Sequence, residues 1–208
     1  REDKLLLKGK PFNKAQSLLA LEKRNIRIYM NSKITSMSLS SIEVETISSD
    51  NKYSTTIPSR TLIWTVGMTP SLPEIEPKPI IKYGKIVVNS NFKVNGSKDL
   101  FAIGDISYNE KNNLSATAQC AIQQGDYMAK SLIAMRAGKD ILSFEYKDYG
   151  EMLSLGIGDA TITALGVTIS GSFAYEIRRM VYLTKMPSIP LGLKSTFSWL
   201  LSKFSKCL

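Results

Sequence analysis

The sequence predicts an α/β fold. Segments with helical periodicity alternate with short runs of strand-forming residues along the 208-residue chain. The hydrophobic share of 43% and the charged share of 22% are those of an ordinary globular protein. No run of eighteen apolar residues occurs, so the sequence predicts no helix that spans a bilayer.

The first third of the chain predicts one helix followed by strands. Asn13 is a suitable N-cap for a helix that continues to Arg24. Strand-type residues then recur in four short runs, at 26–30, 33–37, 42–47 and 53–57, and polar residues 49–52 predict a hairpin between the last two. The apolar run 62–66 predicts a strand that is buried on both faces and ends at Gly67.

The remaining elements alternate in the same way. Short strands are predicted at 85–88 and 100–103, and a long helix at 116–136. A strand pair follows at 152–155 and 161–165, and the chain ends with helices at 173–183 and 191–204.

The composition excludes several classes of chemistry. Histidine is absent, which removes the commonest general base and metal ligand, so no catalytic side chain and no metal site are predicted. Cys120 and Cys207 lie far apart and form no dithiol motif. If the chain serves an enzyme, a cofactor is expected to carry the chemistry. The net charge of +9 favours an anionic partner.

Two motifs resemble landmarks of the pyridine nucleotide flavoprotein superfamily. In the first, Thr65 lies within the apolar run 62–66, and Gly67 and Pro70 follow it; in the second, the run 99–103 ends in Gly104 and Asp105. Glycine admits a close ligand, and a carboxylate at a strand end accepts hydrogen bonds from sugar-type hydroxyls. The resemblance implies that Thr65 and Gly67 lie near NAD(P)H, and that Gly104 and Asp105 bind FAD.

A third motif resembles a segment of type II NADH:quinone oxidoreductases. The sequence of 116–125 matches the A-Q-x-A-x-Q-Q pattern of that family, and 149–156 resembles the start of its C-terminal domain, with the cyanobacterial and plastid type nearest. By this resemblance Ala118 and Gln119 lie near the flavin, and Gln119, Gln123 and Gln124 line the quinone site. Glutamine amides donate hydrogen bonds to a quinone carbonyl without adding charge. An ordinary amphipathic helix is the alternative.

The resemblance implies FAD and NAD(P)H as cofactors and electron transfer from NAD(P)H through FAD to a membrane quinone. It divides the chain into the rear of an NAD(P)H domain (1–79), the rear of an FAD domain (80–140) and a C-terminal α+β membrane-associated domain (141–208). The chain would thus be the remnant of a two-dinucleotide-domain flavoprotein. No G-x-G-x-x-G fingerprint occurs, so the N-terminal half of the enzyme is expected to be absent and the isolated chain inactive.

The C-terminal helix predicts attachment to an anionic membrane surface. No acidic residue follows Glu176, while six Lys and Arg residues do. An apolar stripe runs along the helix, and its predicted membrane contacts are Phe197, Trp199, Leu200, Leu201 and Phe204. A helix docked on the protein's own core is the alternative.

Other functions stay open. A sulfide:quinone reductase-like flavoprotein would need a cysteine pair beside the flavin, and a non-catalytic basic membrane-binding remnant would not need the flavin at all. No nucleic acid partner is predicted, because the basic residues accompany an apolar stripe rather than stacking aromatics. A homodimer stays open, and a peripheral membrane position facing a bacterial cytoplasm or a plastid stroma is expected.

Overall fold

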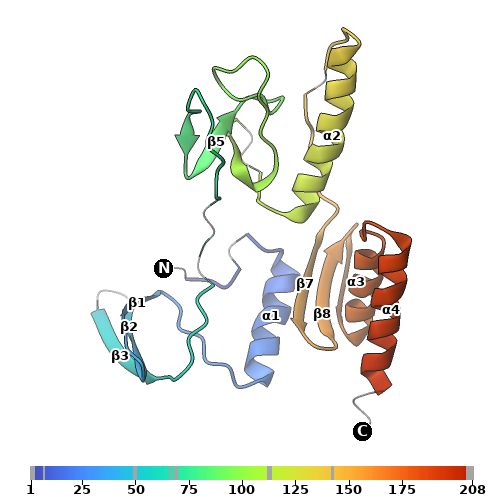
Figure 1. The fold of residues 1–208 in the computed structure, drawn as a ribbon. Helices are drawn as coiled ribbons and strands as arrows, with labels where there is room; N and C mark the ends of the chain where they lie inside the picture. Colours follow the sequence, from blue (N-terminus) through green and yellow to red (C-terminus); the bar gives the residue numbers. More distant parts are fainter. Residues whose placement is uncertain are drawn as a thin grey trace. The chain divides into compact units, whose positions relative to one another are not determined.

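The computed structural model describes residues 3–6, 8–48, 51–65, 67, 70–111, 114–141 and 143–204, without the side chains of 200 and 202–204. The chain forms two compact units (Figure 1). Unit 1 joins residues 1–62 to residues 149–208, and unit 2 consists of residues 63–148. The predicted α/β class is confirmed, with three small three-stranded sheets and helices among the described residues.

An antiparallel sheet forms the centre of unit 1. Its strands are β7 (Glu151–Gly156), β8 (Asp159–Ala164) and β9 (Val167–Gly171), in the order β7-β8-β9. The first two confirm the predicted strand pair. The third was not predicted, and it pairs with β8 across a tight turn at Leu165 and Gly166, both of which have positive φ.

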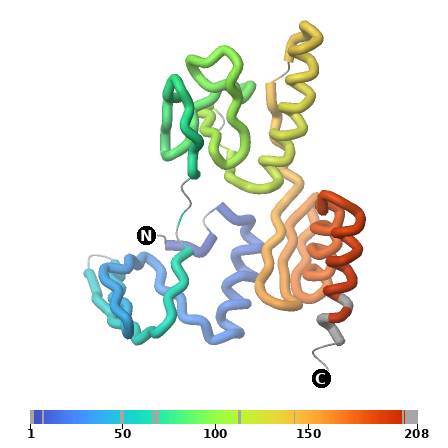
Figure 2. Tube along the Cα trace, viewed as in Figure 1, coloured from blue at the N-terminus to red at the C-terminus, as the bar shows by residue number. Residues whose placement is uncertain are grey.

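The sheet of unit 1 is covered by a helix on each face. Successive side chains of a strand point to opposite faces. Ala160 and Ile162 of β8 pack against Ala174 of α3 (Ser172–Leu183), while Thr161 and Thr163 donate hydrogen bonds to Asn13 of α1 (Pro11–Lys23). Figure 2 shows the N-terminal helix beside strands from the last third of the chain. A segment from each end of the sequence therefore completes one α/β/α layer structure.

The predicted N-cap of α1 is wrong. Lys10 occupies the cap position and Pro11 the first helical position, where the missing N–H of proline is no loss. Asn13 lies inside the first turn and is fully buried. Its side chain faces β7 and β8 instead of capping its own helix, because partners distant in sequence satisfy it.

The second sheet of unit 1 is a meander of β1 (Ser32–Met37), β2 (Ser41–Ser48) and β3 (Asn51–Pro58). The order is β1-β2-β3, all antiparallel, which confirms three predicted strands. Only Val44 is buried among the residues of its strands.

The C-terminal helix α4 (Ile189–Phe204) packs beside α3, and both confirm predicted helices. The guanidinium carbon of Arg179 on α3 lies 4.4 Å from the ring centroid of Trp199 on α4. This cation–π contact fixes one face of α4 against the protein.

Unit 2 is built from a small mixed sheet and one long helix. Strand β4 (Ile81–Lys82) pairs antiparallel with β5 (Lys85–Val88), which pairs parallel with β6 (Ser107–Asn109). The helix α2 (Ala118–Arg136) covers the core, whose buried members are Ile86, Val88, Phe92, Val94, Ala102 and Met128. The predicted strand 85–88 and the predicted helix are confirmed.

Three predicted strands are wrong within the described residues. Residues 26–30 and 62–65 form no strand, and 100–103 contribute only a bridge between Lys93 and Phe101. The predicted burial of the 62–66 run is also wrong for the part described, since Ile63 is 79% and Trp64 56% exposed. Alternation and apolar character specify a strand only when another strand supplies the hydrogen bonds, and no described strand pairs with 26–30 or 62–65. The division at residues 79 and 140 stays a prediction, because contacts group the chain differently from the three parts expected.

Candidate functional site

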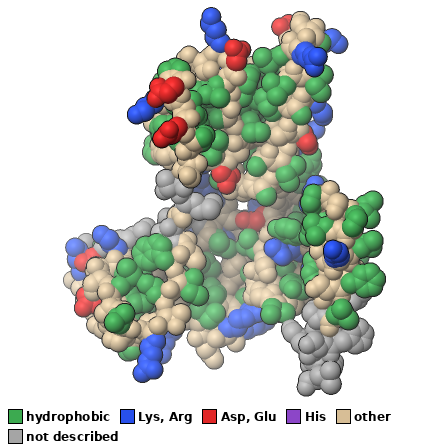
Figure 3. Space-filling view, in the orientation of Figure 1, with side chains coloured by type: hydrophobic (Ala, Val, Ile, Leu, Met, Phe, Trp, Pro, Cys, Tyr) green, Lys and Arg blue, Asp and Glu red, His purple; other side chains and the backbone are tan. Residues whose placement is uncertain are grey.

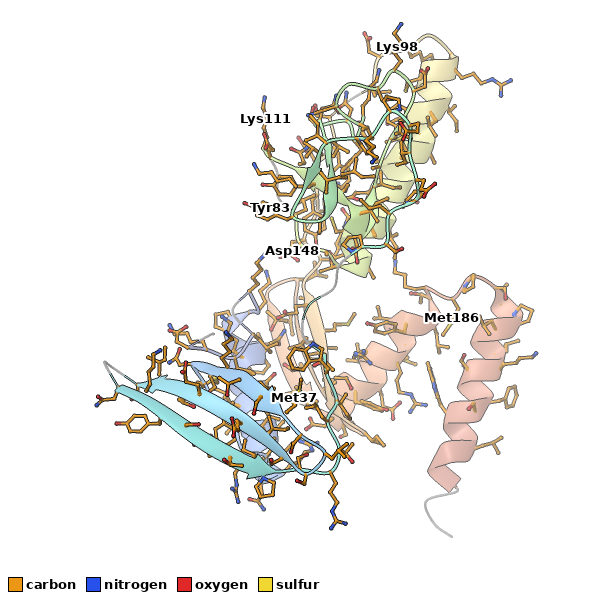
Figure 4. The ribbon with its side chains drawn as sticks, turned by 60° about the vertical axis from the view of Figure 1, so that its left-hand side comes forward. Met37, Tyr83, Lys98, Lys111, Asp148 and Met186 are labelled. Carbon is orange, nitrogen blue, oxygen red and sulfur yellow. The ribbon has the colours of Figure 1, made fainter. Side chains whose placement is uncertain are left out.

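A pocket of about 70 Å³ lies in unit 2 between the β6 side of the sheet and the start of α2. Its lining combines a carboxylate, two ammonium groups and several neutral polar side chains: Asp105, Lys85, Lys111, Ser90, Ser107, Asn109 and Thr117. Figure 4 labels Lys111, whose side chain extends from the loop that follows β6. Charges of both signs with hydroxyl and amide groups suit a ligand that carries both hydroxyls and phosphate.

The Gly104–Asp105 turn forms one wall of this pocket. Gly104 begins a single 3-10 turn, η1 (Gly104–Ile106), with φ of +72°, a conformation that a β-carbon would disfavour. The hydroxyl of Ser107 donates to the Gly104 carbonyl at 2.9 Å and closes the turn. Asp105 is exposed and its carboxylate is therefore open to a ligand.

Gln124 ties this turn to α2. The Gly104 N–H donates to Oε1 of Gln124 at 2.5 Å, and Nε2 of Gln124 donates to the Cys120 sulfur at 3.2 Å. Gln124 is only 4% exposed. Its predicted quinone contact stays a prediction, and its described hydrogen bonds stabilise the fold of unit 2.

The start of α2 faces the same pocket. Thr117 is the N-cap and accepts a hydrogen bond from the Cys120 N–H at 3.2 Å. Ala116 and Thr117 line the pocket, whereas Ala118, predicted to contact the cofactor, is exposed and is not among the lining residues. First-turn N–H groups and the helix dipole favour an anion here.

The other two glutamines of α2 hold a return segment, residues 143–148. The Tyr146 hydroxyl donates to Oε1 of Gln119 at 3.0 Å. Gln123 pairs with the backbone of Lys147 in both directions, accepting from its N–H and donating to its carbonyl, each at 2.9 Å. Phe144 anchors this segment in an aromatic cluster with Phe92 and Tyr127.

The return segment and the two lysines of the pocket were not predicted from the sequence. The alternation of Phe144, Tyr146 and Asp148 on one side with Glu145 and Lys147 on the other was a signal of extended backbone. Nothing in the sequence pattern shows that Lys85 and Lys111 line the same pocket, since 26 positions separate them.

Cys120 is buried at the base of the pocket. Burial and the nearby Asp105 carboxylate raise the pKa of its thiol, and the hydrogen bond from Gln124 opposes this only in part. The thiol is therefore protonated at neutral pH, as suits a buried packing residue rather than a nucleophile.

Thr65 and Gly67 lie apart from these contacts. Both are exposed, and neither lines a pocket of unit 2. Gly67 has φ of +72°, as the T-x-G pattern of a tight turn requires. Their predicted contact with NAD(P)H stays a prediction.

The C-terminal helix presents two of its predicted membrane residues to solvent. Phe197 is 64% and Leu201 67% exposed. Figure 3 shows hydrophobic side chains over α3 and α4, with Phe173 and Met180 of α3 among the exposed ones. Trp199 instead packs on Arg179, and the side chains of Leu200 and Phe204 lie outside the described residues.

The described residues contain no group of three side chains placed to hold a metal ion. None of their helices has the length and apolar character that a bilayer crossing requires.

A profile of pyridine nucleotide-disulphide oxidoreductases matches residues 1–125. The chain belongs to this family. Among named relatives, a demethylphylloquinone reductase of Synechocystis is 30% identical over 96% of the chain and 50% of its own length. A chloroplastic/mitochondrial alternative NAD(P)H-ubiquinone oxidoreductase of Arabidopsis thaliana is 31% identical over 66% of the chain and 29% of its own length. The chain thus spans half or less of these curated relatives.

Two solved structures share the fold of this chain. The NDH2 of Plasmodium falciparum in complex with NADH superposes with a TM-score of 0.74 at 15% identity, over 90% of this chain and 53% of that one. A sulfide:quinone oxidoreductase of Aquifex aeolicus reaches 0.60 at 14% identity, over 81% and 43%. The resemblance seen in the sequence is thereby confirmed at the level of family and fold.

Proposed function

We propose that this chain serves a flavoenzyme that passes electrons from NAD(P)H through FAD to a membrane quinone. The observation that carries the proposal is the Gly104–Asp105 turn, joined by Gln124 to the start of a glutamine-rich helix. Named relatives within the family are quinone reductases.

The residues of the pocket fit part of an FAD molecule. Asp105 would accept hydrogen bonds from ribityl or ribose hydroxyls, and its ionised form makes such bonds strong. Lys85, Lys111 and the first turn of α2 would oppose the charge of a phosphate or an anionic flavin ring. A bound FAD would supply the hydride acceptor and the electron donor to quinone.

On the nicotinamide side, Thr65 and Gly67 would border the dinucleotide, as the motif resemblance implies. On the quinone side, Gln119 and Gln123 would contact the quinone ring or hold the segment that does. Tyr146 fixes the orientation of the Gln119 amide, because its hydroxyl occupies the amide oxygen.

The rival proposals lack a supporting feature of this kind. A disulfide- or sulfide-handling site would need a second cysteine near the flavin, and Cys120 is the buried free cysteine of the described residues. A membrane-binding remnant without flavin would have no use for a polar, charged pocket, and the flavin test below separates it from the enzyme.

Replacement of Asp105 tests the flavin site. We expect Asp105→Ala in the native holoprotein to lower flavin retention by roughly tenfold or more, since one charge-assisted hydrogen bond is worth about 1.5–3 kcal/mol. Gel filtration followed by the ratio of flavin to protein absorbance measures it. Asp126→Ala, an exposed carboxylate further along α2, is the matched control and should retain flavin fully. Wild-type retention in Asp105→Ala would refute the site assignment.

We propose further that the protein attaches to an anionic membrane surface through α4, as a peripheral protein. Phe197 and Leu201 lie exposed on the helix, while Trp199 holds it to α3. The fold therefore presents the apolar residues without unfolding α4. Lys194, Lys203 and Lys206 would each add about 1 kcal/mol near anionic lipid at low salt.

Vesicle flotation tests the membrane surface. The double variant Phe197→Ser, Leu201→Ser should lower partitioning into anionic vesicles by at least about a hundredfold, because each side chain contributes about 1.5–3 kcal/mol when buried in lipid. Ser198→Ala, on the same helix, should partition as the wild type does. High salt should weaken binding without abolishing it. Equal flotation of all three proteins would mean that another surface binds the vesicle, or none.

A further inference from the structure

We infer that Gln124 is a positioning residue: it fixes the Gly104–Asp105 turn in the conformation that presents the Asp105 carboxylate to the pocket. In this role Gln124 acts through the Gly104 backbone rather than by touching the quinone. Its expected effect on flavin retention rests on the proposed flavin site, although the hydrogen-exchange test at Gly104 needs no flavin.

The turn at Gly104 has a conformation that needs a partner for its N–H. Gly104 adopts a left-handed φ of +72° between the extended Ile103 and the 3-10 residues that follow. Its N–H donates to Oε1 of Gln124. Loss of that acceptor would leave a partly buried N–H without its protein partner and would release the turn.

The Gln124 amide has a fixed orientation. Cys120 lies one helical turn before Gln124 on the same face of α2, and its sulfur accepts from Nε2. With the nitrogen held there, Oε1 points at Gly104. A buried side chain whose two polar ends are both bonded has one orientation, so it can set the position of a neighbouring loop.

The charge of Asp105 favours a neutral side chain at position 124. The Asp105 carboxylate lies near enough to Cys120 to raise the pKa of that thiol, so Asp105, Cys120 and Gln124 form one cluster at the pocket wall. A neutral amide at position 124 holds the turn without adding a second negative charge beside Asp105. A carboxylate there would keep the acceptor and add that charge.

Backbone hydrogen exchange of the 208-residue chain directly measures the hydrogen bond between the Gly104 N–H and Gln124. In Gln124→Leu we expect the Gly104 amide to exchange roughly tenfold faster, the factor of one lost hydrogen bond. Gln124→Glu keeps an acceptor at Gly104 and should keep the protection. Gln123→Leu is the matched control: the Lys147 amide should lose protection, since Gln123 accepts from it, and Gly104 should keep it. Far-UV circular dichroism verifies that α2 is intact, and Gln124→Asn, polar but too short, replaces the leucine variant if it unfolds.

Flavin retention by the native holoprotein measures the consequence. Gln124→Leu should lose flavin about tenfold more readily, and Gln124→Glu should recover retention in part, limited by the added charge. Unchanged Gly104 protection in Gln124→Leu would overturn the inference. Faster exchange with wild-type flavin retention would also overturn it, provided that Asp105→Ala does lose flavin. Retention by Asp105→Ala would instead point to failure of the proposed flavin site.

Discussion

Replacement of Gly150 by alanine should cost unit 1 about 2–5 kcal/mol of its free energy of unfolding. Gly150 precedes β7 with φ of +106°, and a β-carbon there would overlap the Thr163 carbonyl oxygen and lie 2.6 Å from the Ala164 α-carbon. Both contacts are with backbone of the neighbouring strand, which cannot rotate away as a side chain would. Overpacking costs about 1–3 kcal/mol and left-handed strain about 1–2 kcal/mol more.

Gly158→Ala is the matched control for this clash. Gly158 also has positive φ, at +77°, in the turn between β7 and β8, but nothing lies within 4 Å of the added β-carbon. It should cost only the strain of about 1–2 kcal/mol. Urea unfolding followed by Trp199 fluorescence in a Trp64→Phe background reports unit 1, because the two tryptophans lie in different units. Equal losses for both glycines would show that the sheet accommodates the methyl group at position 150.

Replacement of Asn13 by leucine should cost unit 1 about 2–4 kcal/mol. Asn13 is 0% exposed, and its amide donates to a Glu151 carboxylate oxygen at 2.7 Å while its oxygen accepts from Thr161 at 2.8 Å and Thr163 at 2.9 Å. Leucine has nearly the same size but leaves the buried Thr161 hydroxyl, the part-buried Thr163 hydroxyl and the Glu151 carboxylate without this partner. A bond to a charged group is worth about 1.5–3 kcal/mol, and a neutral one about 1 kcal/mol.

A double-mutant cycle isolates one bond of this network. With Asn13→Ala and Thr163→Val singly and together, the coupling free energy should be about 1 kcal/mol. Thr163 suits the cycle because it is only part-buried, so the valine variant keeps its packing. Additive losses in the same urea assay would mean that the hydroxyl and the amide do not interact in solution.

Local pattern was sufficient to predict elements whose partners lie nearby in sequence. The meander β1-β2-β3 and the pair β7-β8 are hairpins, so alternation and turn residues define both the strands and their pairing. The same pattern failed at 26–30 and 62–65, where the described part of the chain offers no strand to pair with. β9 was missed because Val167, Ile169 and the intervening Thr168 and Ser170 are too few and too polar to signal a strand alone.

For the site, motif resemblance located Gly104, Asp105 and the three glutamines but not how they are used. Gln119, Gln123 and Gln124 looked alike in sequence, as neutral amides on one helix. Their partners (Tyr146, the Lys147 backbone and Gly104) are up to 27 positions away and depend on how the chain returns along α2. The role of Asn13 was unpredictable for the same reason, since Glu151 is 138 positions further on.

The layer structure of unit 1 also constrains how the protein is made. Helix α1 cannot pack on its sheet until β7 and β8 leave the ribosome, and the 141 residues from 24 to 164, including the 86 of unit 2, are synthesised in between. At about 5–20 residues per second, the first helix waits roughly 7–28 s with its buried polar face in water. Unit 2 is contiguous and completes itself during that interval, whereas α1 can pack on β7 and β8 only after a long loop has closed. Unit 1 is therefore the part of this chain whose folding depends on events late in translation.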